Sequence, residues 1–231
     1  LLRSQKDVLH KKFPQCRVIK FPFEEYPSFF KINKHSSTQS ARKGHYAWKS
    51  ASIKRSADII KEGYLLWLDT KCRCFKSLHQ IVQTITQEGI YSPSSNGDIQ
   101  KWTHCGTLQF MKVPTSFYKY KNRCGGFCGF NLNTPYAHSF LQEWEDFSKI
   151  KNCIAPPGSN RRNHRQDQAL FTILYYRYLH TYGFQDVPRR FGVKTHCTVK
   201  GKPAVMRGKK KIIPKKRKPT KLKKPTIRPK K

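Results

Sequence analysis

The sequence predicts an α/β fold with a mixed, mostly parallel sheet flanked by helices. The apolar run Tyr64–Leu68 follows Gly63 and stops at Asp69, a pattern typical of a parallel strand that is buried on both faces. A helical pattern leads directly into this strand, as in the second half of a βαβ unit. The glycine-rich apolar segment 124–131 predicts a further strand, where glycine allows a ligand or a neighbouring strand to approach the backbone closely.

The other elements follow from local patterns of apolar, polar and turn-forming residues. Gly63 and Gly89 are expected to cap the helices that precede them. We expect a surface helix within 1–12, a strand over 16–21, a basic surface loop over 31–43, helices over 46–62, 77–88, 135–150 and 169–179, a short strand at 90–91, and loops over 92–97 and 153–160.

Positive charge is concentrated at the C-terminal end of the chain. The 231 residues carry a formal net charge of +34, and 16 of the 47 Lys and Arg residues lie from Lys200 onward, where no acidic residue occurs. We therefore expect one domain over 1–199 and a disordered, extended tail rich in Lys, Arg and Pro over 200–231. The domain retains 31 basic against 13 acidic residues and should attract anionic substrates, while the tail should bind polyanions non-specifically.

The cysteines bear on the cellular compartment. All eight lie within 1–199, and their C-x-C and C-x-x-x-C spacings differ from the paired C-x-x-C pattern of structural zinc sites. We expect disulfides formed in an oxidising compartment, with free buried thiols as the alternative. No apolar run reaches the about 18 residues that span a bilayer. The chain begins at Leu1, which is compatible with an upstream segment that holds a membrane anchor.

Asp69 is the first candidate site residue. It follows the predicted strand directly, and ligand crevices in open α/β sheets lie outside the carboxyl ends of the strands. A carboxylate at this place can meet a metal, a ribose hydroxyl or a sugar. Because Asp is also favoured in turns and at helix N-caps, a purely local capping role is the alternative.

A second group of candidates lies at the start of the apolar helix 169–179. The free N–H groups and the dipole at a helix start favour anions, so His164 and Arg165 are predicted to contact phosphate or sugar, and Gln168 to bind hydroxyls. Asp167 can orient hydroxyls, act as a base, or stabilise a positively charged transition state. Its alternative role is to accept hydrogen bonds from the helix N–H groups.

Several segments together resemble a eukaryotic family with a nucleotide-diphospho-sugar transferase (GT-A-like) fold. Their layout is similar to Golgi galactosyl- and mannosyltransferases that carry a strand-end acidic motif and a later Asp-Gln helix. The likeness covers about 1–197. The segments are Phe21–Pro27, Tyr46–Lys49, Leu66–Asp69, Trp102–His104, Gly125–Phe130 and Cys153–Gln168.

The resemblance implies a glycosyltransferase that moves a sugar from a nucleotide-diphosphate donor to a glycan or protein acceptor in the Golgi lumen. It also implies that a first strand–helix unit precedes Leu1. Lys215–Lys218 resembles a nuclear-localisation patch, which leaves a nuclear or cytoplasmic location as the alternative. A catalytically inactive relative and a polyanion-binding protein are the alternative functions.

The resemblance also assigns roles to residues. Asp69–Lys71 stands where related enzymes carry an Asp-x-Asp motif that holds Mn2+ or Mg2+, with Lys71 in place of the second Asp. Asp69 can hold a metal with other ligands, Lys71 can neutralise phosphate in a metal-independent enzyme, or activity has been lost. A late His followed by Gly-Lys-Pro implies His196 as a further metal ligand.

Asp167 is implied as the catalytic residue facing the donor sugar. The resemblance places Lys49 beside Trp48 in the lining of the donor site. Gly125 and Gly126 complete the predicted donor-binding set, because their lack of a side chain suits a strand that lines a pocket.

Overall fold

The computed structural model describes residues 3–196, with side chains from Asp7 onward. The predicted tail over 200–231 lies outside the described residues. The helices are α1 (Arg3–Lys12), α2 (Trp48–Ile60), α3 (His79–Glu88), α4 (Ile99–Trp102), α5 (Cys105–Phe110), α6 (Pro135–Lys149), α7 (Lys151–Ile154) and α8 (Asp167–Tyr182). The strands are β1 (Tyr64–Leu68), β2 (Arg73–Cys74), β3 (Ile90–Tyr91), β4 (Ser94–Asp98), β5 (Lys121–Arg123), β6 (Phe127–Asn131) and β7 (Val193–Lys194).

The central sheet has three strands in the order β1-β6-β3. Both pairings are antiparallel, with Leu66 opposite Gly129 in one and Tyr91 opposite Gly129 in the other. The expectation of a mostly parallel sheet is therefore wrong for the described residues. β1 and β3 run in the same direction, but β6 inserts between them in the opposite direction.

The strand that is buried on both faces is β6 and not β1. All five residues of β6 are buried, whereas β1 is an edge strand whose first residue, Tyr64, is 44% exposed. Gly129 makes this central position feasible, because a Cβ there would lie 2.3 Å from Ile85 Cδ1 and 2.8 Å from Leu66 Cδ2. The apolar run of β1 is thus explained by helices packed on both faces of the sheet rather than by strands on both sides.

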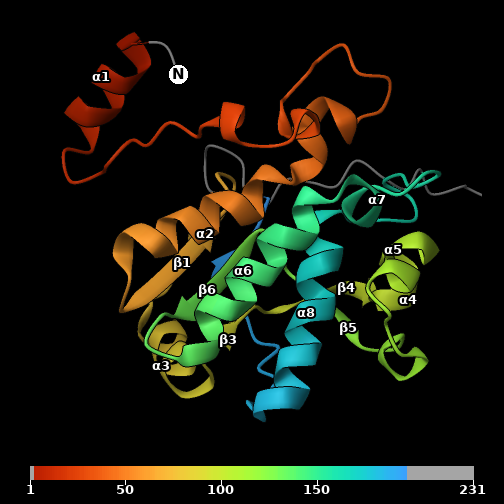
Figure 1. The fold of residues 1–231 in the computed structure, drawn as a ribbon. Coiled ribbons are helices and arrows are strands. Elements are labelled where there is room, and N and C mark those ends of the chain that lie inside the picture. The colour runs from red at the N-terminus through yellow and green to blue at the C-terminus, as the bar shows by residue number, and fades with distance from the viewer. Residues whose placement is uncertain (1–2, 197–231) are drawn as a thin grey trace, which may run out of the picture.

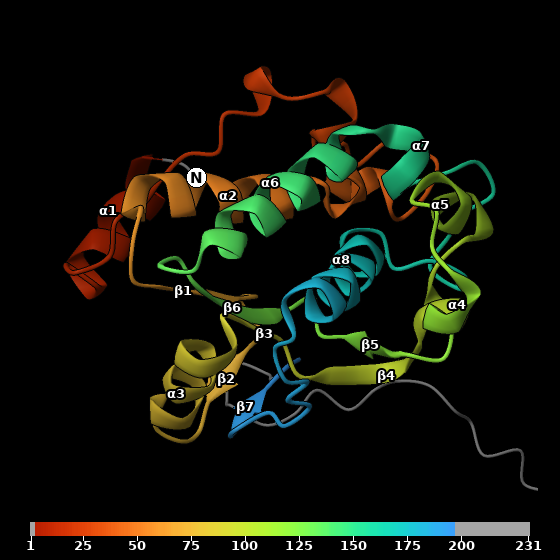
Figure 2. The ribbon, with the colours of Figure 1, turned by 60° about the horizontal axis from the view of Figure 1, so that its bottom comes forward.

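Helices cover the two faces of the central sheet unequally. Figure 1 shows α2, α6 and α8 side by side in front of the sheet, and Figure 2 shows α3 on the opposite side. Alternate strand residues divide accordingly, since Leu65 and Phe130 join the core beneath α2, α6 and α8, while Phe127 and Tyr91 join Ile81 and Ile85 of α3. The domain is therefore a three-layer α/β arrangement with a small antiparallel sheet.

Helix α8 is the central helix of the larger core. Ten of its sixteen residues are buried, as expected of a helix surrounded by protein. It packs against α6 and β5 and begins at Asp167, so the acidic start of the helix is carried into the interior. Gly183 ends the helix in the left-handed conformation, with φ of 72°.

Two antiparallel ribbons complete the fold. β4 pairs with β5 beneath α8, and β2 pairs with β7, with Arg73 opposite Lys194. The loop predicted over 92–97 is wrong, because Ser94–Asp98 forms β4 through this pairing. The strand predicted over 16–21 is also wrong, since this segment has no strand partner and runs as irregular chain.

The predicted helices are confirmed, with shifts at their ends. α2 ends at Ile60, and its cap is Lys61 at φ of 68°, so Gly63 lies beyond the predicted capping position. Gly89 caps α3 as expected. No helix among the described residues is long and apolar enough to cross a membrane.

The predicted disulfides are not formed among the seven cysteines that the structure describes, all of which are free. Cys128 and Cys153 are buried in the larger core, while Cys72 and Cys124 are buried in the smaller core beneath the sheet. The other three described cysteines are exposed. The buried thiols fill apolar space as small hydrophobic side chains do.

Candidate functional site

Three charged side chains meet where β1 ends and α8 begins. The Lys49 ammonium lies 3.2 Å from Asp69 Oδ1 and 3.1 Å from Asp167 Oδ2. It also donates a hydrogen bond of 3.0 Å to the carbonyl oxygen of Gly125. Four of the predicted site residues are therefore brought together from four separate parts of the chain.

Lys49 reaches this place from the first turn of α2. It shares the buried face of that helix with Ile53 and Ala57, which follow at intervals of four residues. Its side chain is only 6% exposed. A buried ammonium is costly unless it is paired and hydrogen-bonded, and the two carboxylates with the Gly125 carbonyl provide that compensation.

Asp69 is held in position by the backbone and by its own strand. Its N–H donates to the Gly126 carbonyl oxygen at 2.8 Å, which extends the pairing of β1 with β6 by one residue. Trp67, two residues earlier on the same face of β1, donates from Nε1 to Asp69 Oδ1 at 2.9 Å. The Asp69 side chain remains 41% exposed, so it is the solvent-facing member of the cluster.

Asp167 is the buried member, with a side chain 7% exposed. Its carbonyl oxygen accepts a hydrogen bond from Trp144 Nε1 of α6. The residue before it, Gln166, has φ of 41° and ψ of −117°, a backbone conformation that residues other than glycine rarely adopt. This strained turn directs the start of α8 into the cluster.

The surroundings of Lys49 and Asp167 shift the pKa values of both side chains. Burial alone would lower the pKa of Lys49, but Asp167 and Asp69 together outweigh this effect and raise it above its usual value. Burial raises the pKa of the Asp167 carboxyl, against the opposing effect of Lys49. The ammonium therefore stays charged at neutral pH, and Asp167 is a stronger proton acceptor than an exposed Asp.

Gly125 and Gly126 lie against the start of α8 and the end of β1. A Cβ on Gly126 would lie 2.9 Å from Asp69 Oδ2, and one on Gly125 would lie 2.9 Å from Gln168 Cβ. Gln168 donates from Nε2 to the Arg123 carbonyl oxygen, so its amide ties α8 to β5. The glycines thus let the start of α8 and the end of β1 approach the same turn.

His164 and Arg165, which were predicted to contact phosphate or sugar, also contact other parts of the protein. His164 is fully buried; its Nε2 donates to the Ile154 carbonyl oxygen, and its Nδ1 accepts from the His104 N–H. Burial lowers the pKa of His164 to about 4. The Arg165 guanidinium stacks on Trp102, with 3.8 Å between its central carbon and the ring centroid. Both residues fasten the segment before α8 to the segment before α5.

Lys71 and His196 are the two predicted phosphate or metal contacts near the β2–β7 ribbon. Both are exposed. Arg73 lies opposite Lys194 in the antiparallel β2–β7 ribbon. Lys71, two residues before Arg73, and His196, two residues after Lys194, therefore lie at the same end of that ribbon. No recorded contact joins either side chain to Asp69.

The charged groups around Asp69 bear on the predicted metal site. No group of three or more His, Cys, Asp and Glu side chains with suitable geometry occurs between Asp7 and His196. The two carboxylates at the site face the Lys49 ammonium, which holds the position between them. The positive charge between the two carboxylates is therefore supplied by the Lys49 side chain.

Two features of the site were missed from the sequence. The sequence contained an indication of the bridging role of Lys49, because a lysine on the apolar stripe of α2 requires a buried partner. It also contained an indication of the contact between Trp67 and Asp69, because residues two apart in a strand share a face. The pairing of each with Asp69 depends on packing between elements that are distant in sequence.

The chain was compared with known families, curated proteins and solved structures. No family profile matches the chain, and no curated protein matches it. Among solved structures, the chain is similar to mouse xyloside xylosyltransferase 1 in its apo form, with a TM-score of 0.40, 13% identity, and coverage of 80% of this chain and 69% of that chain. A TM-score of 0.40 is too low to decide the fold or the function of this chain.

Proposed function

We propose that the chain is a glycosyltransferase domain with a GT-A-like fold, which transfers a sugar from a nucleotide-diphosphate donor. The observation that carries the proposal is the Lys49 ammonium between the Asp69 and Asp167 carboxylates. A half-exposed carboxylate, a buried carboxylate of raised pKa and a buried cation supply the charges that such a transfer requires.

The donor carries a diphosphate whose negative charge must be compensated as the sugar leaves. We assign this role to Lys49, because its ammonium is preorganised in a site of low exposure, where electrostatic interactions are stronger than in water. A diphosphate entering beside Asp69 would attract the ammonium away from the carboxylates. Asp167 would then be left with an unpaired charge at the sugar end of the site.

Asp167 is the proposed catalytic residue. Its raised pKa suits it to take the proton from an acceptor hydroxyl, and its place at the strained start of α8 fixes its direction. Asp69 and Gln168 are proposed to orient the donor, and Gly125 and Gly126 to contribute to the donor site by letting these two side chains approach the turn closely. The compensation provided by Lys49 favours a metal-independent reaction over one that uses Mn2+ or Mg2+ at Asp69.

The test is a thermal-shift titration with a panel of nucleotide diphospho-sugars, with and without Mn2+, followed by an assay of nucleoside-diphosphate release. We expect one donor to stabilise the protein without Mn2+, and Asp167→Asn to lower turnover by about a hundredfold or more while donor binding persists. Asp58→Asn, which changes an exposed surface pair, is the matched control. If no donor stabilises the protein, the inactive or polyanion-binding alternative replaces the proposal.

The compartment and the other partners are proposals that follow from the same function. A lumenal transferase would meet a glycan or protein acceptor in the Golgi, held there by an anchor upstream of Leu1. Titration of the thiols in protein from its native source tests this location. Eight reactive thiols under denaturing conditions would favour the nuclear or cytoplasmic alternative.

A further inference from the structure

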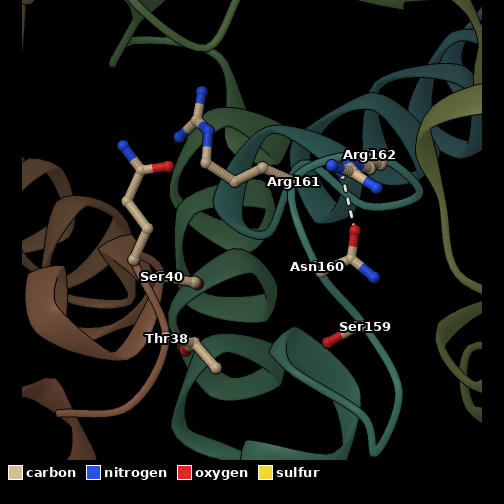
Figure 3. Close-up of a pocket in the computed structure, with 7 residues that line it drawn as sticks. Thr38, Ser40, Ser159, Asn160, Arg161 and Arg162 are labelled. Atoms are coloured by element: carbon tan, nitrogen blue, oxygen red, sulfur yellow. Dashed lines mark hydrogen bonds between the residues drawn. The ribbon is translucent and has the colours of Figure 1, made fainter.

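A pocket of about 370 Å³ lies between two loops that are far apart in the sequence. Figure 3 shows Thr38 and Ser40 on one side and the segment Ser159–Arg162 on the other. The lining residues carry hydroxyl, amide and guanidinium groups and include no carboxylate. We call this cavity the arginine pocket.

The charge around the arginine pocket is of one sign. The sequence has no acidic residue between Glu25 and Asp58 or between Asp146 and Asp167, and these two acid-free stretches supply both walls. Arg161 and Arg162 form no ion pair with any carboxylate that the structure describes. The Arg161 guanidinium extends toward the 38–40 side of the pocket (Figure 3), and a guanidinium beside hydroxyl and amide groups is well suited to an oxyanion.

The 159–162 wall is shaped by its own backbone contacts. Asn160 Oδ1 accepts a hydrogen bond of 2.9 Å from the Arg162 N–H, and Asn163 Oδ1 accepts one of 2.8 Å from the Asn160 N–H. These bonds use side-chain amides to fix the turn. The Arg162 guanidinium has no hydrogen bond or ion pair with any residue that the structure describes.

Tyr46 connects the arginine pocket to the carboxylate site. Arg161 donates from Nη1 to the Tyr46 hydroxyl at 3.2 Å. The guanidinium carbon of Arg161 lies 5.8 Å from the Tyr46 ring centroid, and the Lys49 ammonium lies 6.0 Å from the same centroid. The pocket is therefore about one tyrosine ring away from the cation that bridges Asp69 and Asp167.

Tyr46 is presented by an unusual stretch of backbone. Gly44, His45 and Tyr46 have φ of 58°, 48° and 59°, and for the two residues with side chains this conformation is strained. His45 Nδ1 and the Ser40 hydroxyl lie 3.0 Å apart, which links the strained stretch to the pocket wall. Such strain persists only where the surrounding structure imposes it.

We propose that the arginine pocket binds a sulfate or phosphate group carried by the acceptor, so that the acceptor is an anionic saccharide. The inference rests on the proposed function. The donor's diphosphate is bonded directly to the transferred sugar and must lie next to the carboxylates. An anionic group in the arginine pocket would lie beyond Tyr46, about one sugar residue further from the carboxylates than the diphosphate. We therefore assign that group to the acceptor.

The test measures binding without requiring transfer. Isothermal titration calorimetry at about 150 mM ionic strength, which screens long-range charge, is made on the full chain with glucose 6-sulfate, neutral glucose and pyrophosphate. We expect one saturable site for glucose 6-sulfate and none for glucose. Arg162→Gln should weaken that site about tenfold, the loss expected for one charge-assisted contact, and Arg161→Gln with Arg162→Gln should abolish it.

The matched control is Lys119→Gln with Lys121→Gln, which removes the same charge from two exposed positions outside the pocket. This control variant should bind glucose 6-sulfate within twofold of the unmodified protein. The pocket variants should bind pyrophosphate within twofold of the unmodified protein. Equal weakening by both double variants would overturn the pocket in favour of general surface charge. Loss of pyrophosphate binding, with glucose 6-sulfate binding unchanged, would assign the pocket to the donor instead.

The two proposals can fail separately. A chain that binds glucose 6-sulfate through Arg161 and Arg162 but releases no nucleoside diphosphate from any donor would overturn the transferase and, with it, the acceptor role of the pocket. A chain that transfers sugar but shows no arginine-dependent binding of glucose 6-sulfate would overturn the pocket alone.

Discussion

The Lys49 ammonium lies 3.1 Å from Asp167 Oδ2, and both side chains are less than a tenth exposed. Such a pair is sensitive to the removal of either partner, because the remaining charge is then buried without compensation. Asp69, the second partner of Lys49, faces solvent and can be hydrated. The stability of the site should therefore depend more on Lys49 and Asp167 than on Asp69.

Lys49→Met is expected to lower the free energy of unfolding by about 3–5 kcal/mol, the range for breaking a buried ion pair from one side. Lys54→Met is the control, since Lys54 pairs with a half-exposed Asp58 on the same helix and should cost no more than about 0.5 kcal/mol. Urea unfolding followed by circular dichroism measures both. Equal losses for the two variants would contradict burial of the Lys49 pair.

Combining Lys49→Met with Asp167→Asn gives a sharper version of this test. The double variant removes both charges, so it should recover part of the stability that Lys49→Met loses. A double variant less stable than Lys49→Met alone would show that Asp167 is compensated by groups other than Lys49.

The buried imidazole of His164 should make stability depend on pH. Folding lowers its pKa from 6.5 to about 4, so the folded state favours the neutral form. This contribution is complete above pH 6.5 and is lost as pH falls toward 4, at a cost of about 3 kcal/mol for a shift of this size. His164→Gln should flatten the fall between these pH values, and the exposed His35→Gln should leave it unchanged. An unaltered pH profile in His164→Gln would assign the fall to other groups.

Asp186 is expected to secure the chain that follows α8. Its carboxylate pairs with the guanidinium of Arg123, a fully buried residue that also donates to Tyr176 and to the Ser92 carbonyl oxygen. Asp186→Ala leaves that guanidinium without its counter-charge and should cost about 3 kcal/mol or more. Asp58→Ala, on the surface, should cost about 0.5 kcal/mol or less. Thermal unfolding of both variants measures these losses of stability. A loss in Asp186→Ala as small as in Asp58→Ala would contradict a securing role of Asp186.

The sequence predicted the elements whose patterns are local and long. The helices α2, α3, α6 and α8 and the strand β1 follow from apolar periodicity and from glycine near their ends. The strand directions could not be predicted from local patterns, because β6 lies between β1 and β3 through pairing of segments that are distant in sequence. The polar strand β4 was missed for the same reason, since its pairing with β5 outweighs the turn-forming character of Ser94–Asp98.

The candidate site was predictable to the extent that charged residues stand at the ends of elements. Asp69 and Asp167 were found in this way. Lys49 was expected to line the donor site, but its place between the two carboxylates depends on how α2 packs beside β1 and α8. The arginine pocket could not be predicted, because the loops 38–40 and 159–162 become neighbours only in the folded chain.

Gly126 should be required for the position of Asp69 rather than for the fold. A Cβ at Gly126 would lie 2.9 Å from Asp69 Oδ2, too close for an undistorted contact, so Gly126→Ala must displace the Asp69 carboxylate. We expect it to weaken binding of a nucleotide sugar about tenfold while lowering the free energy of unfolding by about 1 kcal/mol.

The control for Gly126 is a double-mutant cycle with Asp69→Ala. Without the Asp69 carboxylate the obstruction is removed, because the remaining Cβ of residue 69 would lie 3.6 Å away, an ordinary contact. Gly126→Ala should therefore have little further effect on donor binding in the Asp69→Ala background, and the two substitutions should be strongly non-additive. Additive losses would mean that Gly126 acts on the donor directly, by allowing its close approach to the backbone, and not through Asp69.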